Sequence, residues 1–248
     1  MNLMQGDCLE RMKEIPDNSV DMVLTDPPYG TTGCKWDSVI PLDKMWAEIF
    51  RVVKKDSAIV MTASQPFTTT LIASNVKFFK CEWIWQKNAG SNFGSVKFQP
   101  MKEHESAIVF SYGKCPYFPQ MQERNGSGKD RVKYEVNYNT KTDVYADSLH
   151  GKVTSNRPDL RYPSSIQKFN RERGLHPTQK PVALMEYLIK TYTNEGETVL
   201  DFTMGSGTTG VAAKNLNRDF IGIEMDENYF NIAKERIEGV NPLGNFME

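Results

Sequence analysis

The chain has 248 residues, of which 39% are hydrophobic and 25% charged, a balance typical of a globular protein with one sizeable core. Its formal net charge of −1 means that a nucleic-acid partner would have to meet a local basic surface. The cysteines and histidines are too scattered for zinc or redox motifs, so we expect no bound metal. The polar N-terminus and the lack of a long apolar run predict a cytoplasmic protein that does not bind a membrane.

Short β-type runs recur along the chain, and each ends in polar or turn residues. Between several of them lie segments with apolar residues at three- and four-residue steps, as in helices that cover a sheet. This alternation predicts an α/β fold with a doubly wound, mostly parallel sheet. The expected strands are Val20–Thr25, 58–62, 81–85, 107–111, Thr198–Asp201 and 220–224, and the expected helices are 41–54, 181–193, 208–216 and 227–237.

A distinctive tetrapeptide follows the first of these strands directly, at the edge where open α/β sheets bind ligands. Its prolines lack an N–H, so the backbone presents carbonyl acceptors held in place by rigid rings. A carboxylate and a neighbouring carbonyl can hold both hydrogens of an aromatic amine, and a tyrosine can stack on an extruded base. A plain tight turn is the structural alternative. The predicted catalytic residues are Asp26, Pro27, Pro28 and Tyr29.

Residues 112–175 interrupt the alternation, because they are rich in Gly, Asn, Ser, Tyr and charge. From Met121 to Gly174 there are eleven Lys or Arg and seven Asp or Glu, a local charge of 11 − 7 = +4. A solvated loop is one reading of this insertion, and phosphate contact with base stacking is the other. The interleaved residues are Tyr134, Tyr138, Tyr145, Arg157, Arg161, Tyr162, Arg171 and Arg173.

A second buried-type strand, Thr198–Asp201, leads into a glycine-rich turn and then a helix. Gly205 and Gly207 allow a sharp bend and close approach of a ligand to the backbone. Glu224 ends the next strand, and an acid after one β-α-β unit suits the ribose hydroxyls of an adenosine cofactor. The pattern is shared with dinucleotide sites.

An early Asp-Pro-Pro-Tyr and a late Gly-Ser-Gly-Thr-Thr resemble the β group of amino-methylating DNA methyltransferases, in which the catalytic half precedes the cofactor half. Two further segments agree with this resemblance. Asp7 in Gly-Asp-Cys matches the Asp that binds the cofactor's adenine, and residues 176–181, His-Pro-Thr-Gln-Lys-Pro, match the segment over its methionine end. The family usually has Asp-Pro-Phe before the glycine turn, whereas Thr203 stands at the aromatic position here.

The resemblance implies a seven-stranded-type, Rossmann-like methyltransferase sheet with an inserted target-recognition region. The expected parts are a catalytic half at 1–111, the target-recognition region at 112–175 and a cofactor-binding half at 176–248. It implies S-adenosylmethionine as cofactor, DNA as partner and a homodimer as an option. The expected cofactor-binding residues are Asp7, Cys8, Asp201, Phe202, Gly205, Ser206, Gly207, Thr208, Glu224, His176, Thr178 and Lys180.

Local alternatives exist for two of these segments. Asp7 also suits the N-cap of a helix starting at Cys8, and residues 176–181 suit a helix start with Pro181 in the first turn.

The favoured function is methylation of adenine's exocyclic amino group in duplex DNA with base flipping, because Asp at the head of the loop resembles adenine enzymes. The alternatives are a cytosine-N4 methyltransferase, a nucleotide-dependent oxidoreductase, an inactive DNA-binding relative, and an enzyme that modifies RNA or protein.

Overall fold

The computed structural model describes residues 1–34, 37–124, 159–172, 174 and 178–240. These fall into two units, Met1–Phe118 with Ser165–Glu248, and Pro119–Ser164. The first unit carries the large sheet, and the second contains a two-stranded sheet. No helix in the described part of the chain is long and apolar enough to cross a membrane.

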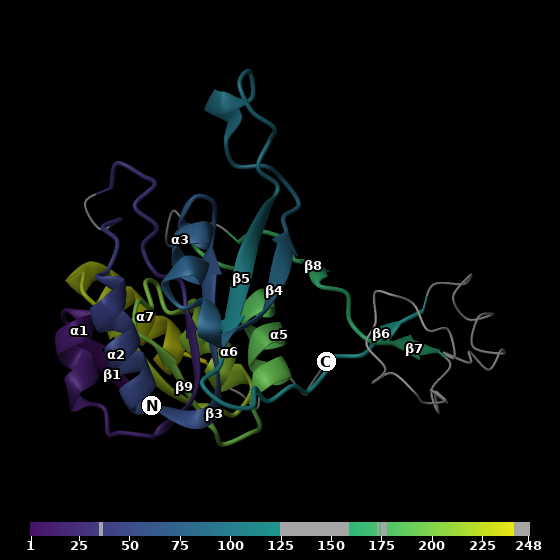
Figure 1. The fold of residues 1–248 in the computed structure, drawn as a ribbon. Coiled ribbons are helices and arrows are strands. Elements are labelled where there is room, and N and C mark those ends of the chain that lie inside the picture. The colour runs from purple at the N-terminus through teal and green to yellow at the C-terminus, as the bar shows by residue number, and fades with distance from the viewer. Residues whose placement is uncertain (35–36, 125–158, 173, 175–177, 241–248) are drawn as a thin grey trace. The chain divides into compact units, whose positions relative to one another are not determined.

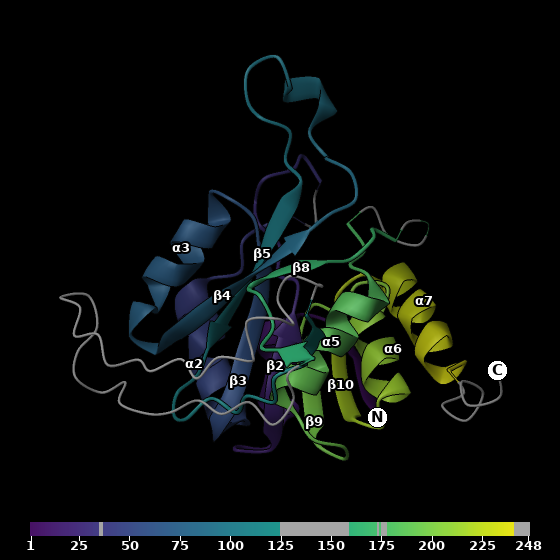
Figure 2. The same cartoon turned by 90° about the vertical axis from the view of Figure 1, so that its right-hand side faces the viewer.

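The large sheet has eight strands in the order β1-β10-β9-β2-β3-β5-β4-β8, drawn in Figures 1 and 2. Only β5 runs antiparallel to its neighbours, so the mostly parallel methyltransferase-type sheet is confirmed. The strands are β1 (Asn2–Gln5), β2 (Val20–Thr25), β3 (Val53–Ala63), β4 (Phe79–Gln86), β5 (His104–Phe110), β8 (Ile166–Lys168), β9 (Thr198–Asp201) and β10 (Asp219–Glu224).

Successive residues of the central strands point to opposite faces, and both faces are covered. Met22 and Leu24 of β2 belong to one core cluster, whereas Val23 belongs to the other. The crossover connections of a parallel sheet place helices on both of its faces. Strands buried on both faces are therefore apolar throughout. Figure 2 shows α2 and α3 on one side of the sheet and α5, α6 and α7 on the other.

The helices follow from amphipathic or small-residue patterns. One face is covered by α1 (Cys8–Arg11), the 3-10 turn Met12–Glu14, α2 (Leu42–Val52) and α3 (Phe67–Ser74). In α2 the residues Met45, Trp46, Ile49 and Val52 are buried, the three- and four-residue spacing of a helix stripe. The other face is covered by α5 (Val182–Tyr192), α6 (Thr208–Asn215) and α7 (Glu227–Glu238).

The direction of winding reverses between β9 and β2. From β2 the chain passes through α2 to β3 on one side, and from β9 it passes through α6 to β10 on the other. Open α/β sheets bind ligands at the carboxyl ends of the strands beside such a switch point. The residues that end these two strands, Thr25 and Asp201, therefore mark the expected site.

The segment expected as an insertion contains the second unit but is wider than it. Residues 165–168 belong to the large sheet, because Ile84 donates its N–H to the Ser165 carbonyl at 2.8 Å and β8 then pairs with β4. This strand makes the sheet one strand larger than the seven-stranded type. Within the second unit, β6 (Gln122–Glu123) pairs with β7 (Leu160–Arg161). Tyr134, Tyr138, Tyr145, Arg157 and Arg173 lie outside the described residues.

Candidate active site

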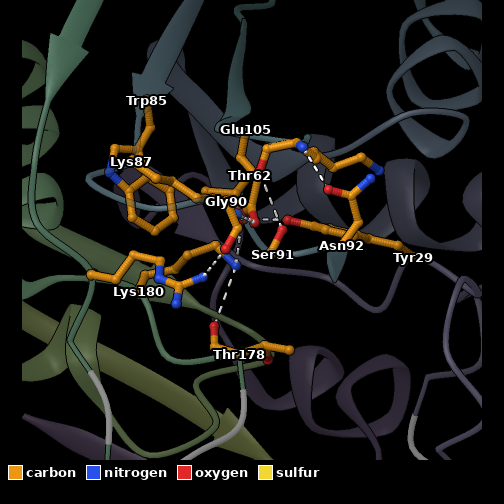
Figure 3. Close-up of polar contacts among 12 residues, drawn as sticks. Tyr29, Thr62, Trp85, Lys87, Gly90, Ser91, Asn92, Glu105, Thr178 and Lys180 are labelled. Atoms are coloured by element: carbon orange, nitrogen blue, oxygen red, sulfur yellow. Dashed lines mark hydrogen bonds and ion pairs between the residues drawn. The ribbon is translucent and has the colours of Figure 1, made fainter. Parts of the chain in front are cut away.

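The Asp26 side chain lies just beyond β2 and is surrounded by hydrogen-bond donors. Its Oδ1 accepts from the Tyr29 hydroxyl at 2.7 Å and from the Thr62 hydroxyl at the end of β3. Its Oδ2 lies 2.5 Å from the Lys180 ammonium. Figure 3 shows the side chains of Tyr29, Thr62, Glu105 and Lys180 directed toward one common centre. The carboxylate remains 25% exposed, so a ligand can still reach it.

Lys180 is a buried cation held between carboxylates. Its Nζ is 3.4 Å from Glu105 Oε2, and the other oxygen of Glu105 pairs with Lys87 at the end of β4. Burial opposes a charged lysine, but Asp26 and Glu105 together raise the pKa of Lys180 above its usual value. Burial likewise opposes the Glu105 charge, yet Lys180 and Lys87 lower the pKa of Glu105. The cluster therefore holds two negative and two positive charges in balance.

Tyr29 is fixed by contacts on its ring and on its hydroxyl. The ring stacks on Phe67 of α3, with 5.3 Å between centroids and 19° between planes, and the Lys180 Nζ lies 5.6 Å from the ring centroid. Burial and the nearby Asp26 charge raise the pKa of Tyr29 well above its usual value. The hydroxyl consequently stays protonated and acts as a hydrogen-bond donor to Asp26.

The backbone that follows Tyr29 is held by a single carboxylate. Asp37 Oδ1 accepts from the N–H groups of Tyr29 and Gly30 at 2.7 and 2.9 Å. Its Oδ2 accepts from Thr31 and Thr32 at 2.9 and 2.6 Å. Burial alone would raise the pKa of Asp37, but the hydrogen bonds lower it. Asp37 thus remains ionised and fixes the backbone that carries Tyr29.

Hydroxyl groups connect the Asp26–Tyr29 loop to the glycine turn. Thr25 donates to the Asp201 carboxylate at 2.7 Å, and its oxygen is 2.6 Å from that of Thr203. Thr203 in turn donates to the Asp26 backbone carbonyl at 3.1 Å. Burial raises the pKa of Asp201 to about 6. Thr203, at the position where the resembled family carries an aromatic residue, therefore joins the two halves of the site.

The glycine turn is bound to the acid at the end of β10. Glu224 accepts from the N–H of Gly205 at 2.8 Å and from that of Asp226 at 2.8 Å. Gly205 and Gly207 have φ of 53° and 81°, a region that favours glycine. A Cβ at Gly205 would meet no heavy atom within 4 Å, whereas one at Gly207 would lie 2.9 Å from the Ala233 Cβ. Gly205 therefore leaves open space before the turn, and Gly207 permits packing against α7.

The other expected cofactor residues have different positions. Asp7 caps α1, accepting from the N–H groups of Leu9 and Glu10 at 2.9 and 3.3 Å, and Gly6 bonds to the Glu224 carbonyl at 2.9 Å. Thr178 contributes its carbonyl, 3.5 Å from the Lys180 Nζ. Cys8 begins α1 and is partly buried. The side chains of Phe202, Ser206 and Thr208 are buried, and His176 lies outside the described residues.

Four residues of the site have no motif that would have identified them in the sequence: Thr62, Lys87, Glu105 and Asp37. The first three lie at the ends of β3, β4 and β5, which meet at one edge because β5 is antiparallel to the other two. Position at a strand end was the available signal, but many residues share that position.

Comparisons with known proteins identify the family of the chain. The profile of the N6/N4 DNA methylase family matches residues 20–235. The chain is 29% identical over 275 residues to the type II methyltransferase M.HinfI of Haemophilus influenzae, covering 99% of this chain and 70% of that protein. It is 28% identical over 250 residues to M.HpaI of Haemophilus parainfluenzae, covering 95% of this chain and 74% of that protein.

Solved structures show the same fold. The M1.HpyAVI–SAM complex has a TM-score of 0.65 at 28% identity, covering 95% of this chain and 98% of that one. The cytosine-N4-specific PvuII DNA methyltransferase has a TM-score of 0.67 at 16% identity, covering 98% and 88%. The family match excludes the oxidoreductase alternative. This protein belongs to the N6/N4 DNA methylases, which transfer a methyl group from S-adenosylmethionine to a base amino group of DNA.

Proposed function

We propose that this protein methylates the exocyclic N6 amino group of adenine in duplex DNA after the base is flipped out of the helix. The observation that carries the proposal is the Asp26 carboxylate, paired with Lys180 and fixed by Tyr29 and Thr62 at the switch point of the sheet. Aspartate at the head of this loop supports adenine over cytosine-N4, where the resembled family more often carries serine.

The hydrogen bonds of Asp26 support a different proposed role for each of its two oxygens. A carboxylate oxygen has two lone pairs, and Oδ1 already accepts from Tyr29 and Thr62. Among the described residues, Oδ2 accepts from Lys180 alone. Oδ2 therefore has a lone pair for one amino hydrogen, while the rigid backbone carbonyl of Pro27 is the proposed acceptor of the other. Holding both hydrogens directs the nitrogen lone pair away from the loop, toward the methyl donor.

The base itself requires a face to stack on once it leaves the duplex. Tyr29 supplies an aromatic ring that is already fixed by Phe67 and by the Asp37 brace. Stacking on such a ring contributes roughly 1–3 kcal/mol per base, against the few kcal/mol that unstacking costs. Tyr29 thus offsets part of the cost of base flipping.

The glycine-turn edge fits S-adenosylmethionine. The open space before Gly205 admits a ligand against the backbone, and the Glu224 carboxylate lies at that turn to receive ribose hydroxyls. Asp7 lies on the next strand end, beside Glu224, and Met225 is 60% exposed where an adenine ring could pack. When bound, the cofactor supplies the methyl group. Residues 201–208 and 176–180 complete this proposed cofactor site.

The fit can be tested through cofactor affinity. Glu224→Gln keeps the size of the side chain but weakens its acceptance of ribose hydroxyls, so we expect roughly tenfold weaker binding of S-adenosylmethionine by calorimetry. Glu227→Gln, three residues further on α7, is the matched control. Equal affinity in the wild type and the Glu224 variant would contradict the ribose assignment.

The decisive experiment for the base is incubation with S-adenosylmethionine and mixed-sequence DNA, followed by modification-sensitive sequencing. We expect methyladenine within one recurrent sequence. Modified cytosine with unmodified adenine would overturn the adenine assignment.

Target recognition by residues 112–175 and assembly as a homodimer are further parts of the proposal. Replacing residues 125–158 with a short linker tests the first, and light scattering tests the second.

A further inference from the structure

The hairpin formed by β4 and β5 extends beyond the rest of the large unit. Figures 1 and 2 both show its connecting segment projecting from the edge of the sheet. This hairpin tip, residues 88–103, includes the 3-10 turn Phe93–Ser95. The tip belongs neither to the Asp26–Tyr29 loop nor to the glycine turn.

Large apolar side chains at the tip face solvent. Phe98 is 89% exposed and Phe93 is 61% exposed, and Val96 and Met101 are also exposed. Lys97 lies directly between Val96 and Phe98 and is exposed. Isolated exposed apolar residues are common, but several on one projecting segment indicate an interaction surface.

The base of the tip is well fixed, so Phe98 is presented from a defined support. Asn92 donates to the Pro100 carbonyl at 3.1 Å and accepts from the Lys102 N–H at 2.6 Å. The Gly90 carbonyl accepts from the Arg171 guanidinium at 3.2 Å. A Cβ at Gly90 would lie 2.1 Å from Met101 Cγ, so the Met101 side chain of one arm packs directly over Gly90 of the other.

The tip is also continuous with the catalytic cluster. Lys87, directly after β4, and Glu105 of β5 flank the tip and pair with each other, and Glu105 contacts Lys180 beside Asp26. Lys102 reaches the Gln65 carbonyl just beyond β3 at 3.5 Å.

We propose that the hairpin tip enters the duplex at the target site and that Phe98 occupies the space left by the flipped base. This inference rests on the proposed function. Apolar wedges such as phenylalanine are inserted between base steps by proteins that deform DNA, and basic neighbours bind the adjacent phosphates. The tip combines both features, because Lys97 and Lys102 accompany the exposed aromatics, and it adjoins the residues that receive the base.

The test uses Phe98→Ala, Phe98→Leu and, as a matched control, Val76→Ala, which removes a 68% exposed apolar side chain at the opposite end of β4. Each full-length variant is assayed with tritiated S-adenosylmethionine on two duplexes that contain the sequence methylated by the wild type. One duplex is fully paired, and the other carries an abasic site opposite the target base. Extrusion is easier from the second duplex.

We expect Phe98→Ala to lower kcat/KM on the paired duplex by about tenfold or more, a free-energy change of roughly 1.4 kcal/mol, and to recover to within about threefold on the abasic duplex. Phe98→Leu and Val76→Ala should stay near the wild type on both. An unchanged Phe98→Ala on paired DNA would overturn the wedge, and so would an equal loss on both duplexes.

A second copy of this chain is the other occupant to consider. Light scattering of each variant distinguishes contact with a second copy from insertion into DNA. A change of mass in Phe98→Ala would assign the tip to a subunit interface and overturn the proposal. A wild type that methylates no DNA would instead contradict the proposed function. Thermal stabilisation by S-adenosylmethionine in every variant verifies that the fold is retained.

Discussion

The Lys180 ammonium lies 2.5 Å from the Asp26 carboxylate, although 154 residues separate the two in the sequence. The ion pair joins the segment before α5 to the Asp26–Tyr29 loop after β2. Its presence assigns Lys180 a direct contact with Asp26, in addition to its expected place in the cofactor half. The roles of Asp26 and Lys180 can therefore be tested by measuring methyl transfer and cofactor binding separately in variants of each.

Asp26→Ala should remove most methyl transfer while leaving cofactor affinity largely intact. The carboxylate contacts Tyr29, Thr62 and Lys180, not the glycine turn. Loss of one positioned polar group lowers kcat by roughly 10²–10³-fold in comparable sites. Tritium transfer to DNA and calorimetry with S-adenosylmethionine measure the two properties, with Asp43→Ala as an exposed control. Full activity in the Asp26 variant would refute the catalytic assignment.

Lys180→Met should lower kcat more than it weakens cofactor binding. The change leaves Asp26 and Glu105 without the cation between them, and breaking a buried pair destabilises a fold by about 3–5 kcal/mol. We expect a loss of about 100-fold in single-turnover rate. Lys180→Arg keeps the charge and should retain more stability, and exposed Lys44→Met is the control.

The alternative for Lys180 is a role only at the methionine end of the cofactor. In that case the Kd for S-adenosylmethionine would rise in Lys180→Met while the rate at saturating cofactor stayed constant. The comparison of Kd with single-turnover rate therefore separates the two assignments.

Asp37→Ala should reduce both stability and activity through the loop that carries Tyr29. Four backbone N–H groups lose their acceptor, and we expect about 2 kcal/mol less stability in urea unfolding. Because the pKa of Asp37 is lowered, its contribution exists above the unfolded-state pKa and disappears as pH falls through the folded-state pKa. Asp37→Asn keeps one acceptor oxygen, so its stability and activity should lie between those of the wild type and Asp37→Ala. Identical activity in the wild type and both variants would show that Asp37 does not support the loop.

Asp201→Asn should change the pH dependence of stability. The pKa of Asp201 is raised from 3.8 to about 6, so the folded state binds more protons than the unfolded state between these values. Wild-type stability from this group therefore falls as pH rises through that window, by roughly 2 kcal/mol. The variant lacks this slope, so its Tm relative to the wild type should rise between pH 4 and pH 7.5. A difference in Tm that stays constant across this pH range would contradict the shift.

Much of the fold could be predicted from the sequence because its signals are local. Strands Val20–Thr25 and Thr198–Asp201 begin and end where the apolar runs predicted, and the four predicted helices lie within two residues of α2, α5, α6 and α7. The sequence patterns of the edge strand β1 and of helix α3 are weaker. No residue of β1 is fully buried, and α3 buries only Phe67, Thr68 and Leu71. Such short elements depend on tertiary pairing for their stability.

The reaction class was determined by the sequence alone, because the Asp26–Tyr29 tetrapeptide and the glycine turn are contiguous motifs. Only the tertiary structure decided how their side chains are supported. Thr62, Glu105 and Lys180 reach Asp26 from three separate segments, and Asp37 folds back on the loop it follows. These contacts depend on which strand ends meet at the sheet edge. Periodicity reports which residues are buried within an element, but it carries no information about which distant charges compensate one another.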